Sequence, residues 1–192
     1  MPDSRPEVLD FLLTRRSRPA RTLHGPGPDR AALTPILEAG LRVPDHGKLE
    51  PWELLVLERA ALDRLAAAVT DAGPRAGQDA EQTAKQAAMF ADAPLIVAVV
   101  SRPVDSPKIP RVEQRASAAC VCLSVLNAAL AAGWGANWLT GWTATEPGFL
   151  EHGLALAPPA RIAGYVVIGT EGAAPPERPR PDPAAKIRWL DG

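Results

Sequence analysis

The chain has 192 residues, 46% hydrophobic and 22% charged, which is typical of a globular protein rather than a disordered one. This length predicts a single domain with a substantial core. Lysine and arginine number 21 against 22 aspartate and glutamate, so the formal net charge is −1. Because nucleic-acid-binding proteins usually carry a basic excess, this balance argues against a nucleic-acid partner.

Hydrophobic periodicity predicts the first two helices. One apolar stripe covers residues 7–14 and ends at a cluster of arginines, and a second covers residues 29–41. Pro35 leaves two starts open for the second helix. Either Thr34 caps it with Pro35 in the first turn, or it begins near Asp29 and is kinked.

The middle of the chain alternates between strands and helices. Residues 52–57 are predicted to form a buried strand, followed by alanine-rich helices at 60–72 and 79–90. The run 94–100 is apolar throughout and rich in β-branched residues, so we expect it to lie centrally in a sheet.

The longest predicted helix covers residues 111–132, about 33 Å at 1.5 Å per residue. Its many small residues allow close approach from several sides, so it belongs at the centre of a domain or at a subunit interface. Residues 161–169 are predicted as another buried strand. The tail at 173–183 carries five prolines and is expected to be extended. Residues 186–190 then add either an edge strand or an arm across a partner.

Export, membrane and metal-binding signals are missing from the sequence. The first five residues contain no apolar segment of a secretory signal, and the run 94–100 is too short to span a bilayer. Cys120 and Cys122 point in different directions on a helix, which disfavours a disulfide, and we expect both to be buried. A reducing cytoplasm fits best, with no membrane partner. No cluster has metal-ligand spacing, so no metal site is predicted.

The sequence also offers no side chain as a catalytic acid, base or nucleophile. There is no Gly-x-Ser-x-Gly elbow, and neither cysteine has a histidine partner nearby. The pair Gly133 and Gly135 follows a helix and lacks the further glycine of a dinucleotide fingerprint. A cofactor must therefore carry any redox chemistry.

Two basic stretches near the N-terminus each allow a functional and a plainer interpretation. Guanidinium groups bind phosphate through charge-assisted hydrogen bonds, and a serine hydroxyl adds another, so residues 15–18 suit a phosphate. The same residues also suit a solvated basic turn at a helix end. The second stretch, residues 42–52, also has a plainer interpretation. In it, Arg42 caps a helix, His46 is a turn residue and Trp52 is a core residue.

The order of the motifs resembles the nitroreductase superfamily, most closely its small YdjA-like branch. The resemblance extends over about residues 7–170. It rests on Arg15-Arg16-Ser17, Arg42-x-Pro44-Asp45-His46, Pro51-Trp52 before a strand, Ala93-Pro94 before a strand, Pro110-Arg111-x-Glu113-Gln114 opening the long helix, and Gly133 to Thr140.

The resemblance implies an α+β fold, with a central, mostly antiparallel sheet flanked by helices. It implies one nitroreductase-like domain over residues 1–192, with residues 173–192 as a proline-rich extended arm, and a homodimer formed through long helices. FMN would lie at the subunit interface, with NADH or NADPH as co-substrate. The reaction would be ping-pong hydride transfer to a small electron-poor acceptor such as a nitroaromatic or a quinone.

Particular residues are assigned to FMN by position in the family pattern. The implied cofactor-binding residues are Arg15, Arg16, Ser17, Arg42, His46, Trp138, Leu139 and Thr140. Arg15 to Ser17 would hold the phosphate and ribityl end, and Arg42 and His46 would come from the partner subunit. The chain departs from the branch at Leu139, where relatives have arginine, and at Gly47, where they have a lysine that Lys48 replaces. Both departures bear on substrate preference.

Two other functions remain open on the same scaffold. One is a flavin reductase that acts on enones, quinones or halogenated aromatics. The other is an FMN-binding protein with a non-redox or sensing role.

Overall fold

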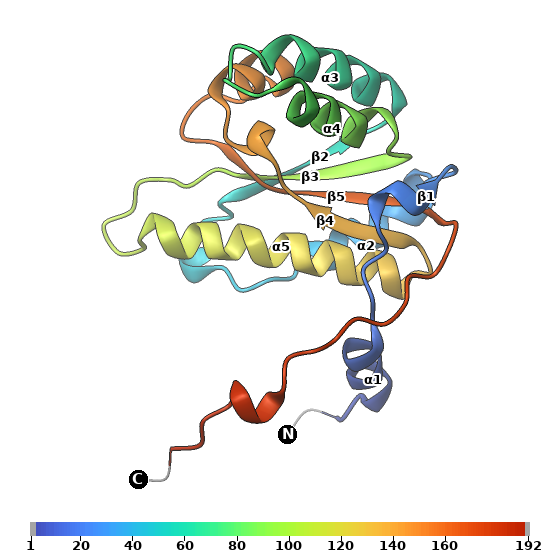
Figure 1. Cartoon of the computed structure of the whole chain (residues 1–192). Helices are drawn as coiled ribbons and strands as arrows, with labels where there is room; N and C mark the ends of the chain where they lie inside the picture. Colours follow the sequence, from blue (N-terminus) through green and yellow to red (C-terminus); the bar gives the residue numbers. More distant parts are fainter. Residues whose placement is uncertain (1–2, 191–192) are drawn as a thin grey trace.

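A five-stranded antiparallel sheet forms the middle layer of the computed structural model, which describes residues 3–190 (Figure 1). The strands are β1 (Leu23–His24), β2 (Trp52–Leu57), β3 (Leu95–Ser101), β4 (Gly135–Leu139) and β5 (Arg161–Glu171). Their order is β1-β5-β3-β2, and β4 also pairs with β5. Residues 1–2 and 191–192, at the ends of the predicted domain and arm, lie outside the described residues.

Helices cover both faces of the sheet, with α3 and α4 on one side and α2 and α5 on the other (Figure 1). The helices are α1 (Pro6–Thr14), α2 (Arg30–Gly40), α3 (Arg59–Ala72), α4 (Ala80–Ala91) and α5 (Arg111–Ala131), with a π-helical turn at Phe149–Gly153 and 3-10 turns at Ala20–Thr22, His46–Lys48, Trp142–Ala144 and Pro183–Ala185. The predicted α+β class, with a central antiparallel sheet flanked by helices, is confirmed.

Strand β3 lies between two hydrophobic cores, and every residue along it is buried. Ile96 and Val100 pack toward α3 and α4, whereas Val97 and Val99 pack toward α2 and α5. This is the alternation that a strand with period two gives when both faces are covered. The central position predicted for this run is therefore confirmed.

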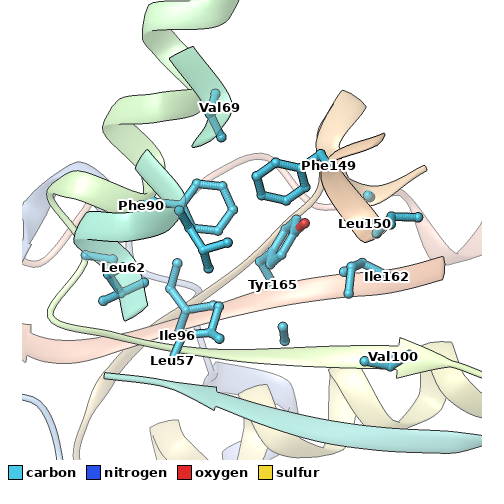
Figure 2. Close-up of a cluster of buried hydrophobic side chains, with 14 of the residues drawn as sticks. Leu57, Leu62, Val69, Phe90, Ile96, Val100, Phe149, Leu150, Ile162 and Tyr165 are labelled. Carbon is cyan, nitrogen blue, oxygen red and sulfur yellow. The ribbon is translucent and has the colours of Figure 1, made fainter. Parts of the chain in front are cut away.

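The core under α3 and α4 is built around three aromatic rings (Figure 2). Phe90 lies with its ring centroid 5.3 Å from that of Tyr165, edge to face, and 5.7 Å from that of Phe149. Tyr165 faces this core, as does Ile162, because a register shift between β3 and β5 interrupts the alternation between them. The π-helical turn delivers Phe149 to the same core.

Helix starts follow local capping chemistry. The Asp29 carboxylate accepts a hydrogen bond from the Ala32 N–H at 2.8 Å, so α2 begins beside Asp29 and Pro35 lies inside the helix. Helix α2 reaches α5 closely at Gly40, where a Cβ atom would overlap the Val125 side chain. This close packing fixes α2 and the loop that follows it against α5.

Helix α1 and the C-terminal tail project away from the sheet (Figure 1). No residue of α1 is buried, although Leu9 and Leu13 are apolar and 60% and 74% exposed. Trp189, near the end of the described tail, is 84% exposed. The tail is extended apart from one 3-10 turn, as its prolines predict.

Several local predictions were wrong. Strand β2 is an edge strand rather than a buried one, because it pairs only with β3 among the described residues, and Val56 is 38% exposed. Of the two alternatives predicted for residues 186–190, the edge strand does not form, and the arm across a partner stays a prediction. Cys122 is buried but Cys120 is exposed, since residues two apart on α5 face different ways.

One helix of the described chain, α5, is long and apolar enough to cross a membrane by length and composition. In the fold, however, α5 packs against α2 and the sheet. The side chains of Val121, Val125 and Ala129 are fully buried against α2 and the sheet, and Gln114 is buried among backbone carbonyls. This is the burial pattern of a core helix in a folded domain.

Candidate functional site

An arginine cluster gathers after α1, where the chain passes the end of α5 and meets β4. The Arg18 N–H donates to the carbonyl of Ala136 on β4 at 2.9 Å. Arg15 Nη2 donates to the Ser17 hydroxyl at 2.8 Å, and Arg16 Nη1 to the Ser17 carbonyl at 3.1 Å. The predicted residues Arg15, Arg16 and Ser17 therefore lie together beside β4.

The cluster gains a member from the far end of the chain. Arg180 approaches the Arg15 carbonyl with its Nη2 at 3.5 Å. Burial and the nearby charges of Arg180, Arg16 and Arg18 lower the pKa of Arg15. The arginines are thus close enough to repel one another, and an anion among them would relieve that repulsion.

Acidic partners are present for some of these arginines and not for others. Arg18 pairs with Glu171 at 2.7 Å, and Arg180 pairs with Glu177 at 2.8 Å. Within the described residues, Arg15 and Arg16 have no acidic partner, and their Nε atoms are buried without a hydrogen-bond partner. Buried donors without acceptors are costly, so this arrangement suits an anionic group such as a phosphate.

His46, from the other basic stretch, lies at the opposite end of α5. His46 Nδ1 is 2.8 Å from a carboxylate oxygen of Glu113, in the first turn of that helix. The Ser117 hydroxyl donates to the Pro44 carbonyl at 2.6 Å and holds the loop in place. Arg42, just after α2, is exposed.

These two groups are not brought together within one chain. Helix α5 is about 32 Å long, with His46 at its first turn and the Arg15–Arg18 segment beyond its last one (Figure 1). A ligand shorter than α5 cannot contact both His46 and the arginine cluster of the same chain.

The end of β4 holds the remaining predicted residues. Trp138 is half-buried, and its indole covers Gly164 so closely that a Cβ atom there would overlap Nε1. Leu139 packs on the core under α3 and α4, and Thr140 is exposed directly after the strand. The Arg18 N–H bonds to Ala136 on this strand, so the segment 138–140 follows the arginine cluster along β4, with Trp138 and Leu139 on opposite faces of the sheet.

Sequence reasoning missed Arg180 and Glu171 as members of this site. Glu171 ends β5, and its partner Arg18 was noted only as one of a run of arginines. Arg180 lies in the proline-rich tail, and nothing in its local sequence relates it to Arg15. Only the folded path of the tail brings it there.

Comparison with known proteins identifies the family. The model of the nitroreductase family matches residues 12–170. The chain belongs to the nitroreductase family, which is a family of oxidoreductases. The curated relatives include YdjA of Escherichia coli strain K12, named as an NAD(P)H nitroreductase, which is 34% identical over 85% of this chain and 88% of its own length. A Haemophilus influenzae protein named in the same way is 31% identical over the same shares.

Solved nitroreductase structures share the fold of the whole chain. A nitroreductase-like family protein from Bacillus cereus has a TM-score of 0.82 and 23% identity and covers 100% of both chains. A nitroreductase from Bacteroides fragilis, solved with bound FMN, has a TM-score of 0.74 and 23% identity over 96% of this chain and 99% of its own. The nitroreductase fold predicted from the sequence motifs is therefore confirmed.

Proposed function

We propose that this nitroreductase-family protein binds FMN, oxidises NADH or NADPH, and reduces small, flat, electron-poor acceptors such as nitroaromatics and quinones. The observation that carries the proposal is the pair Arg15 and Arg16, which are crowded by other cations, have no acidic partner and keep buried Nε donors unused. A phosphate ester supplies the charge and acceptor oxygens that these groups need. The FMN-bound relative from Bacteroides fragilis has the same fold.

The residues of the chain would bind and orient the cofactor rather than supply an acid or a base. Arg15, Arg16 and Ser17 would hold the phosphate and ribityl end. Trp138 to Thr140, at the end of β4, would lie along the flavin, where the half-buried Trp138 indole retains an unpaired Nε1 donor. When bound, FMN supplies the hydride chemistry that no side chain of this protein offers.

We also propose that the active form is a cytoplasmic homodimer with FMN at its interface. In this arrangement residues 1–192 form one domain with an extended arm from residue 173, and residues 186–190 of that arm lie on the partner. The exposed apolar residues of α1 support this, because an amphipathic helix gains most of its stability by burying its apolar face. The separation along α5 supports it as well, because Arg42 and His46 would then meet the flavin of the partner subunit.

A subunit-complementation experiment tests the shared site. Arg16→Ala and Arg42→Ala chains are purified separately, unfolded together and refolded, and FMN binding is titrated. If each site uses both chains, random pairing in a symmetric dimer restores about a quarter of the wild-type sites. If all the contacts come from one chain, the mixture binds no more FMN than its two parents do.

A further inference from the structure

We infer a second ligand site, for a small carboxylate carried on an apolar ring, between α5, the start of β5 and the segment 145–160. Two adjoining cavities of about 280 and 200 Å³ lie there and share Arg115, Thr145, Pro159 and Arg161 as lining residues. The cavities are separate from the arginine cluster, and the proposal does not rest on flavin binding.

Position along β5 separates these cavities from the arginine cluster. Ala136, which binds the Arg18 backbone, pairs with Ile168, whereas Arg161 begins the strand. At about 3.3 Å per residue, the interval from 161 to 168 is roughly 23 Å.

The cavities also avoid the other basic stretch. Arg115 and Glu113 are two residues apart on α5, which turns their side chains about 200° away from each other. Because His46 binds Glu113, Arg115 lies on the opposite side of the helix from His46.

The positive charge at these cavities is not neutralised by the protein. Arg111 pairs with Asp105 at 2.7 Å, and the neighbouring Arg102 pairs with Glu53 at the same distance. Within residues 3–190, Arg115 and Arg161 form no ion pair. Arg115 and Arg161 line both cavities, so an anion there would lie beside two arginines without acidic partners.

A buried hydroxyl without a hydrogen-bond partner also favours a carboxylate ligand. Ser101, at the end of β3, is 5% exposed, and its Oγ has no hydrogen-bond partner among the described residues. Ser101 lines the smaller cavity together with both free arginines. A carboxylate oxygen would accept the Ser101 O–H and remove the cost of leaving that buried group unpaired.

The other residues that line the cavities are mostly apolar, so the part of the ligand beyond its carboxylate should be apolar as well. Leu150 and Leu156 line the larger cavity and Ile162 the smaller one, along with several prolines. Leu150 and Ile162 belong to the buried cluster that contains the three aromatic rings (Figure 2). An aromatic carboxylate combines a charged end for the arginines with a flat apolar body for this wall.

The probe is 4-bromobenzoate, added to the full-length protein with its flavin present. Calorimetry measures its affinity for the wild type and for Arg161→Gln, Arg115→Gln and Ser101→Ala, with Arg30→Gln as the control. Arg30 is exposed and does not line the cavities, and among the described residues it pairs with Glu58 alone, at 3.4 Å, so its loss leaves the cavities intact. We expect saturable binding, weakened about tenfold by either cavity arginine variant and less by Ser101→Ala, and unchanged by Arg30→Gln.

A crystal soaked in the same probe locates the site through the anomalous signal of bromine. A peak in the cavities, together with the calorimetric pattern, supports the proposal. No binding in solution, affinity unchanged in both cavity arginine variants, or a bromine peak only at the arginine cluster or the flavin would each overturn it. Ser101→Ala removes an unpaired group and stays folded, so it reports on binding even if an arginine variant misfolds.

Discussion

Replacing Arg16 with alanine isolates the phosphate contact in the proposed FMN site. Arg16 has no acidic partner among the described residues, and its buried Nε is unpaired, so the guanidinium is available to the ligand. One hydrogen bond to a charged group contributes about 2 kcal/mol. At 1.4 kcal/mol per tenfold change in affinity, Arg16→Ala should weaken FMN binding roughly 25-fold.

The assay is a fluorescence titration of the apoprotein with FMN and, separately, with riboflavin, which lacks the phosphate. Arg16→Ala should weaken only FMN binding, while Arg30→Ala, which removes the same charge from an exposed arginine paired with Glu58 after β2, should change neither. Unchanged FMN affinity, or an equal loss for FMN and riboflavin, would refute the assignment of Arg16 to the phosphate.

The other predictions concern the two cores and the cysteines. Phe90→Ala removes the ring between Phe149 and Tyr165 and should lower the free energy of unfolding by about 3–5 kcal/mol in a urea titration; a loss below about 1 kcal/mol would contradict the packing described. Gly40→Ala should cost about 1–3 kcal/mol by overlap with Val125, and Val125→Ala in the same chain should show a smaller combined loss than the sum of the two. Burial raises the pKa of the Cys122 thiol to about 12, so a thiol reagent at pH 8 should leave it unmodified until the protein unfolds; modification at the rate of a free thiol would contradict its burial.

Local signals predicted most of the helices and the central strand. The apolar run around Val97 has only one stable environment, a strand covered on both faces, and the structure places it there. Strand β2 is also largely apolar, but its place at the edge depends on which strands pair, and no local pattern encodes pairing. The same holds for β4, which contains Gly135 and has no β-branched residue.

The candidate site likewise has one part that the sequence predicts and another that only the fold reveals. Arg15, Arg16 and Ser17 are adjacent in sequence, so their grouping is visible before folding. Arg180 reaches Arg15 only because the tail leaves the sheet past the segment after α1, which charge and proline content do not predict. The distance between this cluster and His46 also emerged only from the fold, because it depends on how α5 lies between them.

The most direct test of the proposed function is the visible spectrum of the purified full-length protein under anaerobic conditions, before and after NADPH or NADH is added. Our account predicts a yellow protein whose bound FMN loses its visible absorbance with either nucleotide and regains it when a nitroaromatic or a quinone is added. A colourless protein that cannot be reconstituted with FMN would contradict it, as would a flavin that neither nucleotide reduces.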